Sequence, residues 1–318
     1  MLRFNAVLMA LVLAAPALAQ EKAVKIVLGF PAGATSDLLS RVVADHMRQT
    51  LGQPVVVENK PGAGGQVANE GVKSAPADGA TLLMTPVATM SIYPHSYGAQ
   101  LRYDPFKDFE PVAHLSDFQL SLGVSAKVPA TTLAEYVALV KKDPKTYGFY
   151  ASAAPGSIPH FLGVMFARAA GIELTHVPYK GTAPVLQALA AGEIVAATTL
   201  SADIGTLVKG GKARLLAVAG AKRDAAFPDV PTFKESGYDM VGTGWYGFFA
   251  PAGTPAAPID RLAKAAIAAV RDPAVNKRLS DMGLEPTGLG PSELGRIMKA
   301  DYEKWGPVIK ASGFKSTQ

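Results

Sequence analysis

Hydrophobic and polar positions along the first part of the chain predict strands and helices that follow one another. Short runs of β-branched and aliphatic residues precede stretches whose apolar positions recur at helical spacing. Thr35 or Ser36 is expected to cap the first helix, and Gly52 is expected to end it. The expected elements are strands at 24–28, 55–57 and 80–85 and helices that end at residues 51 and 74. This alternation is typical of βα units around a mostly parallel sheet.

The pattern restarts after residue 110 and predicts a second set of βα units. Strands are expected at 112–122, 147–150, 175–179, 215–219 and 244–250, and helices at 133–140, at 183–191 and behind the loop 151–160. Thr131 or Thr132 should cap the helix at 133. Apolar positions between residues 259 and 305 recur only at helical spacing, so the tail is expected to contain helices and no strands.

The length of 318 residues suggests two domains, at roughly one domain per 100–200 residues. Because the tail helices bring no strands of their own, we expect them to pack on the first domain. The predicted division is a signal peptide at 1–19, a first lobe formed by 20–122 with 244–318, and a second lobe at 123–243. The chain would cross between the lobes near 120–124 and 240–246, which suits a hinge that closes on a ligand.

The N-terminus is typical of a secretory signal peptide. Arg3 supplies a positive charge, residues 6–15 are apolar, and Ala17-Leu18-Ala19 offers a cleavage pattern before Gln20. Even when it is counted through the cleavage pattern to residue 19, the apolar stretch has about 14 residues, which is shorter than the roughly 20 that span a bilayer. The sequence therefore predicts a soluble protein exported to the periplasm.

Composition and charge exclude several classes of protein. The chain has no cysteine, which excludes disulfide frameworks, thiolate metal sites and cysteine nucleophiles. Its 31 basic and 26 acidic residues give a formal net charge of +5. The basic residues form only short groups, such as Lys141-Lys142 and Lys222-Arg223. We therefore expect no binding of nucleic acid.

Motifs for catalysis, cofactors and metals are weak. The chain has no G-x-S-x-G elbow, Walker loop or H-E-x-x-H motif, and the segment 62–67 has Val67 where a dinucleotide-binding loop has its third glycine. No cofactor and no metal are expected. Ser157 and His160 lie three residues apart at a helix start, where serine is usually a cap. The protein is predicted not to be an enzyme, and a periplasmic hydrolase that uses this pair is the alternative.

Two strand-to-helix loops rich in small residues, 30–37 and 152–160, are the better candidates for a site. Gly33 and Gly156 are expected to leave backbone N–H groups uncovered, and each helix start adds partial positive charge. A carboxylate between two such loops in opposite lobes would collect several backbone donors without Lys or Arg.

Over nearly all of its mature length the chain resembles the Bug-type extracytoplasmic solute-binding proteins of tripartite tricarboxylate transporters. The stretches that carry the resemblance are 30–37 (FPAGATSD), 55–65 (VVVENKPGAGG), 76–82 (PADGATL), 176–181 (HVPYKG), 228–233 (PDVPTF) and 249–255 (FAPAGTP). Each is modest alone, but in this order they are highly specific.

The resemblance implies an α/β fold of the two-lobed type II periplasmic-binding class, a Venus flytrap with mostly parallel sheets flanked by helices. It also implies a carboxylate held between the lobes, partly through bound water. Matched residue by residue, the ligand-binding positions fall on Phe30, Ala32, Gly33, Ala34, Thr35 and Asp37, on Ser152, Ala153, Gly156, Ser157 and His160, and on Tyr179, Gly181 and Thr182.

The chain departs from the family's pattern near these positions. Members commonly read Pro-Pro-Gly-Gly where segment 31–34 reads Pro-Ala-Gly-Ala, and the added methyl groups restrict the backbone. Many relatives carry an acidic residue where this chain has Thr199, the last expected site residue. This change removes a partner for a ligand amino group and favours a non-amino carboxylate. Asp203, farther along, is interpreted as a surface cap.

We therefore expect a periplasmic solute-binding protein that captures a small organic carboxylate. It would deliver this ligand to the membrane permease subunits of a tripartite tricarboxylate-type transporter. A component that presents its ligand to a membrane sensor is a further alternative. A monomer is expected, because a carrier must diffuse to its transporter.

Overall fold

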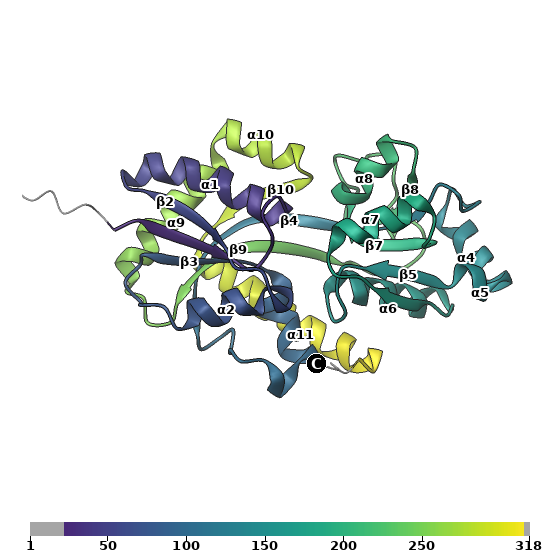
Figure 1. Ribbon diagram of the computed structural model, residues 1–318, viewed down its shortest axis with the longest axis horizontal. Coiled ribbons are helices and arrows are strands. Elements are labelled where there is room, and N and C mark those ends of the chain that lie inside the picture. The colour runs from purple at the N-terminus through teal and green to yellow at the C-terminus, as the bar shows by residue number, and fades with distance from the viewer. Residues whose placement is uncertain (1–21, 315–318) are drawn as a thin grey trace, which may run out of the picture.

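The computed structural model describes residues 22–314, and the predicted signal peptide lies outside them. Two groups of strands and helices lie side by side along the molecule (Figure 1). The elements as far as the long strand β4 are β1 (Val24–Leu28), α1 (Thr35–Leu51), β2 (Val55–Asn59), the 3₁₀ turn η1 (Ala63–Gly65), α2 (Gln66–Lys73), β3 (Thr81–Pro86), the π-helical turn η2 (Ala88–Ile92), α3 (Tyr93–Ser96), η3 (Gly98–Gln100) and β4 (Phe109–Ser125).

The second group follows β4, and the chain then returns to the first. The second group contains α4 (Leu133–Lys142), α5 (Pro144–Tyr147), β5 (Phe149–Ser152), α6 (Ile158–Ala170), β6 (Thr175–Pro178), α7 (Thr182–Ala191), β7 (Ala196–Leu200), α8 (Ser201–Lys209) and β8 (Ala213–Val218). The returning part contains β9 (Thr243–Pro251), α9 (Ala256–Arg271), α10 (Pro273–Asp281), β10 (Leu284–Leu289) and α11 (Pro291–Ser312). None of the helices within 22–314 is both long and apolar enough to span a membrane.

The strands form a mixed sheet in the order β2-β1-β3-β9-β4-β7-β5-β6, with β8 and β10 also paired to β4. The pairs of β1 with β2 and β3, and of β5 with β6 and β7, are parallel, as the βα pattern predicts. Every partner of β4 is antiparallel to it, as is β9 to β3. The parallel units are therefore confined to the outer strands. The chain leaves along β4 and returns along β9, so these two strands must run in opposite directions.

Strand β4 belongs to both halves of the sheet. Its residues 109–119 pair with β9, whereas residues 120–124 pair with β7 and residues 121–125 with β8. The change of partner therefore falls between Gln119 and Leu120. This change lies three residues before the predicted boundary, and we propose to keep the division into a first lobe (20–122 with 244–318) and a second lobe (123–243), joined through β4 and the entry into β9.

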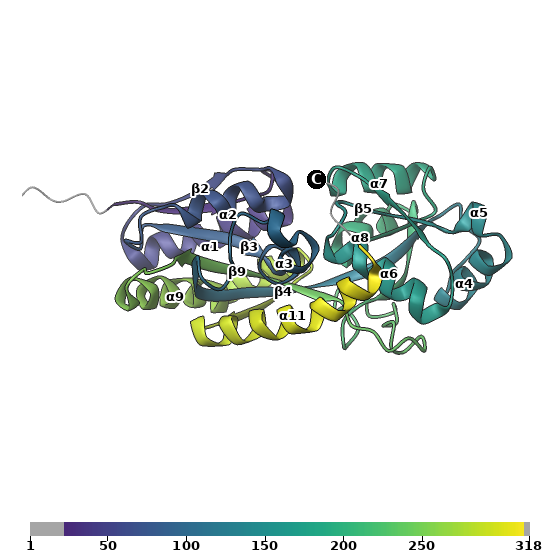
Figure 2. The same cartoon turned by 90° about the horizontal axis from the view of Figure 1, so that it is seen from below.

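The tail helices pack on the first lobe. Helix α9 contacts α1 and β4, and α11 runs along the underside of the first lobe until it reaches α6 (Figure 2). The expectation of a tail without strands is wrong, because β10 pairs antiparallel with β4. Only Leu284 and Gly288 of this strand are buried, so its sequence lacks a strong hydrophobic alternation.

The helix caps confirm two predictions and correct a third. Thr132 and Glu135 form a reciprocal capping box at α4, and Gly52 ends α1 in the left-handed conformation. Neither Thr35 nor Ser36 caps α1, since both lie inside the helix and its N-cap is Ala34, which makes no side-chain bond.

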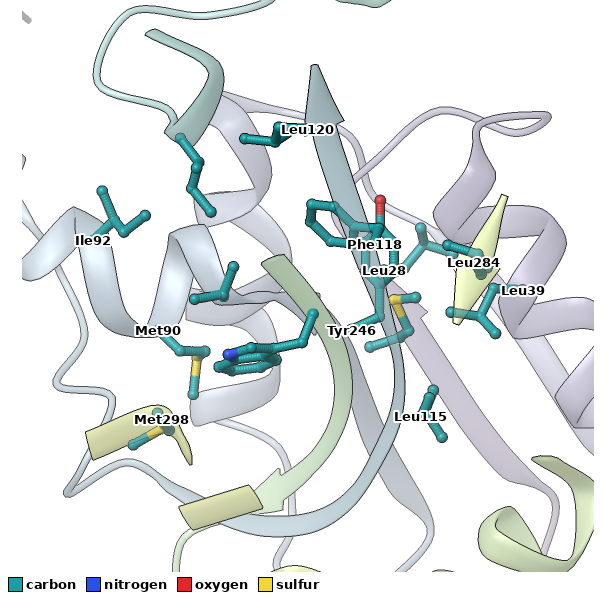
Figure 3. Packing of buried hydrophobic residues seen from close by; sticks show 14 of the residues in the cluster. Leu28, Leu39, Met90, Ile92, Leu115, Phe118, Leu120, Tyr246, Leu284 and Met298 are labelled. Atoms are coloured by element: carbon teal, nitrogen blue, oxygen red, sulfur yellow. The ribbon is translucent and has the colours of Figure 1, made fainter. Parts of the chain in front are cut away.

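A hydrophobic core runs through both lobes by way of β4. In the first lobe, Leu28, Leu39, Phe118 and Leu284 bring β1, α1, β4 and β10 together (Figure 3). A second buried cluster fills the other face of the second lobe's sheet and includes Val185, Leu189, Ile204 and Leu215. These cores hold in place the ends of the strands that carry the candidate loops.

Helix α6 packs so closely on β5 that Gly163 has no room for a side chain. A Cβ there would lie 2.1 Å from Cε2 of the buried Tyr150 ring. We expect Gly163→Ala to lower the free energy of unfolding by about 1–3 kcal/mol. A Cβ on Gly71 in α2 would have nothing within 4 Å, so Gly71→Ala should be neutral or stabilising by about 0.5–1 kcal/mol. Urea titration of both variants measures this difference, and equal effects would contradict the close packing.

Candidate functional site

The first candidate loop joins β1 to α1 and is organised by Asp37. This side chain is only 2% exposed. Its Oδ2 accepts hydrogen bonds from Gly33 N at 2.9 Å and Arg41 Nε at 3.0 Å, and its Oδ1 accepts one from Asn59 Nδ2 at 2.9 Å. Asn59 Nδ2 also donates to Phe30 O at 3.0 Å. Asp37 therefore ties the loop both to its own helix and to the end of β2.

Burial raises the pKa of the Asp37 carboxyl, but the hydrogen bonds from Arg41, Gly33 and Asn59 together outweigh it and lower that pKa. Asp37 is thus a structural carboxylate, charged at neutral pH. Because its oxygens take up the Gly33 N–H, the expectation that this N–H is uncovered is wrong. The donors that remain are the first-turn amides of Thr35 and Ser36, which have no acceptor within residues 22–314.

The second candidate loop repeats this layout in the other lobe. Gly156, with φ of 73°, donates its N–H to His160 Nδ1 at 3.0 Å, so this N–H is not uncovered either. Ser157 is the N-cap of α6: its Oγ accepts from His160 N at 3.4 Å and donates to Ala154 O at 2.7 Å. In both loops a left-handed glycine donates to a buried side chain four residues later. We call this bond the glycine latch.

The second latch fixes the tautomer of His160. Its Nδ1 accepts a hydrogen bond from the Gly156 N–H, so the ring hydrogen of the neutral imidazole is assigned to Nε2. The His160 ring stacks on His176 at a centroid distance of 4.1 Å, and His176 Nε2 lies 2.8 Å from Ser152 Oγ. Burial lowers the pKa of His160 to about 4. Burial and, to a lesser degree, His160 lower the pKa of His176 to about 3. Both rings are therefore neutral at physiological pH.

The third expected segment lies directly beside the second loop. Tyr179 N donates to Ser152 O at 3.0 Å, and Gly181 N donates to Ala153 O at 2.9 Å. Gly181, with φ of 103°, is the N-cap of α7 and makes no side-chain bond, so the helix start at Thr182 is uncapped. The structure thus brings together the expected residues of these two segments.

Thr199 lies at the carboxyl end of β7 and leads to a residue that the sequence interpretation set aside. Its side chain is buried, and its Oγ1 donates to Asp203 Oδ2 at 3.0 Å. Asp203 sits half-buried in the first turn of α8 and does not cap it, since the N-cap is Leu200. Burial raises the pKa of Asp203, and the bond from Thr199 opposes this. The spacing of four residues across a helix start was the sequence signal that could have predicted the hydrogen bond between Thr199 and Asp203.

These groups occupy the sides of the lobes that face each other. Helix α1 begins at the side of the first lobe nearest the second (Figure 1). The first loop stands alone there, while the other segments cluster in the second lobe. A groove of about 730 Å³ elsewhere on the first lobe is lined by Lys73, Arg102, Phe106 and other residues, none of which belongs to the expected site.

The geometry does not pair a nucleophile with a base at Ser157. The Ser157 hydroxyl is bonded to backbone atoms, and the His160 ring nitrogen that lacks a proton is bonded to Gly156. Ser152 and His176 are hydrogen-bonded, but Ser152 is 0% exposed. A catalytic serine needs an accessible hydroxyl beside an accepting base. The arrangement instead presents backbone amides and a neutral imidazole N–H.

Comparison with known proteins finds similarity along most of the chain. Residues 39–314 match the family model described as the tripartite tricarboxylate transporter family receptor. Among solved structures, periplasmic binding protein BugD is 32% identical, with a TM-score of 0.83 over 93% of this chain and 99% of that one. R. palustris Rpa4515 with adipate is 31% identical, with a TM-score of 0.86 over 92% and 97%. MatC from Rhodopseudomonas palustris with bound malate is 31% identical, with a TM-score of 0.81 over 90% and 98%.

These similarities confirm the resemblance to Bug-type proteins and the two-lobed α/β fold expected from it. The family consists of ligand-binding receptors. The individual site residues stay a prediction, to which the structure adds the geometry described above.

Asp37→Asn should lower the free energy of unfolding by about 2–3 kcal/mol at pH 7, because Arg41 and Gly33 lose a charged acceptor. Asp45, an exposed residue of the same helix paired with Arg48, provides the matched control. Asp45→Asn should cost less than about 1 kcal/mol. Urea unfolding compares the two variants, and equal costs would mean that Asp37 does not organise the loop.

Stability should fall as the pH drops from 7 to 5. The unfolded chain protonates His160 near its ordinary pKa of about 6.5, whereas the folded protein resists protonation down to about pH 4. Folding therefore loses stability as pH falls through this window, by about 2 kcal/mol at pH 5 from His160 alone. His160→Asn keeps an acceptor for Gly156 and should remove about half of this pH dependence of urea unfolding, because His176, whose pKa is also lowered, keeps its own contribution. His46→Asn on α1 is the control, and an unchanged slope in His160→Asn would contradict the assignment.

Proposed function

The chain belongs to the tripartite tricarboxylate transporter receptor family, and on this premise we propose that it is a periplasmic solute-binding protein for a small organic carboxylate. The ligand would lie between the lobes and be enclosed when they approach each other. The observation that carries the proposal is the pair of glycine latches, each of which fixes a helix start on the facing side of its lobe. The adipate and malate bound to the two relatives support a carboxylate as the ligand.

The proposed contacts are mainly backbone groups. The amides of Thr35 and Ser36 in the first lobe and the uncapped start of α7 in the second provide N–H donors near positive helix ends. His160 Nε2–H adds a neutral side-chain donor. We assign ligand contact, directly or through water, to positions expected from the sequence: Phe30, Ala32, Gly33, Ala34 and Thr35, Ala153, Gly156, Ser157 and His160, and Tyr179, Gly181, Thr182 and Thr199. The buried side chains of Asp37 and Ser152, also expected there, are assigned the role of holding the two loops in place.

The finer parts of the proposal follow from the family and the N-terminal sequence. The signal sequence would direct the protein to the periplasm as a monomer, where it would deliver its ligand to the permease subunits of a tripartite transporter. It would carry out no covalent chemistry and need no cofactor. The bonding of the Ser157 hydroxyl to backbone atoms supports binding over hydrolysis.

Thermal unfolding of residues 20–318 tests the proposal. Bound ligand should be stripped first by unfolding in denaturant and refolding. A carboxylate present at about 100 times its Kd should then add roughly 2.7 kcal/mol and raise the midpoint by a few degrees. The panel contains aliphatic and aromatic carboxylates, amino acids and, as neutral controls, sugars. A response to sugars alone, or to none of the carboxylates, would contradict the proposal.

Ser157→Ala separates the carrier from a hydrolase. Loss of the N-cap should cost about 1 kcal/mol of stability, while carboxylate binding should persist within a few-fold. The wild-type protein should release no alcohol or amine from ester and amide probes. Turnover that disappears in Ser157→Ala would support the hydrolase instead.

A further inference from the structure

Asp203 is a carboxylate with too few partners. Its Oδ2 accepts one hydrogen bond, from Thr199, and within residues 22–314 no donor reaches its Oδ1 and no Lys, Arg or His pairs with it. Buried Asp37, by contrast, has donors on both oxygens, including Arg41. Buried Asp224 likewise accepts from the Ser201 hydroxyl and from Ala226 N. These two buried carboxylates therefore lack the shortage seen at Asp203, which half-buried Asp301 shares, since Trp245 Nε1 is its one hydrogen-bond donor within residues 22–314.

Asp203 also stands where the two lobes meet. The preceding residue, Ala202, touches Gly283 of the first lobe, where a Cβ would lie 2.4 Å from the Ala202 Cβ. Burial and, secondarily, the negative charge of Asp203 raise the pKa of Tyr246, which lies on β9. The carboxylate thus faces first-lobe strands from the start of α8. It lies on the same side of the second lobe as the other proposed contacts, since it is bonded to Thr199.

A half-buried charge without a counter-ion or a full set of donors is costly. A second carboxylate placed beside it would add repulsion, because like charges within about 4–6 Å disfavour each other. A ligand group that carries a hydrogen, such as an ammonium or a hydroxyl, would instead supply the missing donor. The site therefore discriminates between ligands by whether the ligand group beside Asp203 Oδ1 can donate a hydrogen bond.

We propose that Asp203 is a specificity-determining residue that accepts a hydrogen bond from the ligand, so that the bound molecule is an amino- or hydroxy-substituted carboxylate. The inference rests on the proposed function and narrows its substrate class. It also reverses the expectation of a non-amino ligand drawn from Thr199. The Thr199 hydroxyl donates to Asp203, which lies four residues farther along the chain. The chain therefore has an acidic acceptor near position 199, although residue 199 itself is not acidic.

Matched ligands that differ in one substituent test this inference. The probes are succinate, L-malate and L-aspartate, then glutarate, 2-hydroxyglutarate and L-glutamate, and finally propionate, L-lactate and L-alanine, each titrated by calorimetry into stripped wild-type protein. In at least one of these series the hydroxy or amino member should bind at least tenfold tighter than the unsubstituted acid. The preferred member distinguishes a hydroxyl donor from an ammonium donor.

Asp203→Asn is the companion variant. It should weaken an amino ligand by about tenfold to a hundredfold, but a hydroxy ligand by only a few-fold, because the Asn carbonyl oxygen still accepts a hydrogen bond. Glu193→Gln removes the same charge from an exposed position just before β7, at the strand end opposite Thr199, and should leave binding unchanged.

The outcomes separate the inference from the proposed function. Unsubstituted acids that bind as tightly as their substituted partners, or a preferred substituted ligand whose affinity does not change in Asp203→Asn, would overturn the role of Asp203 while carboxylate binding stands. Wild-type protein that binds no carboxylate would overturn both. The wild-type selectivity decides the question even if Asp203→Asn does not fold.

Discussion

The hydrogen bonding of strand β4 into both lobes is the constraint on which the rest of the structure depends. Its register shifts between Pro111 and Ala113, between His114 and Ser116, and between Leu122 and Gly123 let one strand follow a curled sheet. Gly123 leaves no space for a side chain against Ile204 and the Arg214 carbonyl. Because both edges of β4 are paired, the lobes can move relative to each other only by bending strands, which is a hinge motion.

The C-terminal helix adds a third connection close to the ligand side. Trp305 and Phe314 pack near Phe161, and the Phe314 ring also meets His160. A Cβ on Gly156 would lie 3.1 Å from the Phe314 ring. The latch of the second lobe is therefore in contact with a segment that belongs to the first. A displacement of α11 would therefore act on the loop at 152–160 through these rings.

Sequence reasoning located the loops well but not their internal bonds. The periodicity of apolar residues placed α1, α4 and the strands that end at both loops, because burial of one face produces that pattern. It missed β10, which buries little, and it misjudged the N–H groups of Gly33 and Gly156. Those bonds depend on the rotamers of side chains four residues away. Asp203 was interpreted as a surface cap because its proposed role depends on contacts between the lobes, which no local sequence pattern contains.

The two glycine latches have the same arrangement of backbone donor and side-chain acceptor, but the acceptors carry different charges. The groups around each acceptor explain this difference in charge. In the first lobe the acceptor is the Asp37 carboxylate, whose charge is balanced by Arg41. In the second lobe the acceptor is His160, which burial keeps neutral, so the latch adds no negative charge beside the helix starts. Neither latch then opposes the partial positive charge of the helix ends, and an anion can be held without a cationic side chain. The charge of Asp37 is balanced by Arg41 and His160 is neutral, so Asp203 is the proposed site residue whose charge has no counter-ion in the protein. Its side chain can therefore select among carboxylate ligands by the substituent that they carry.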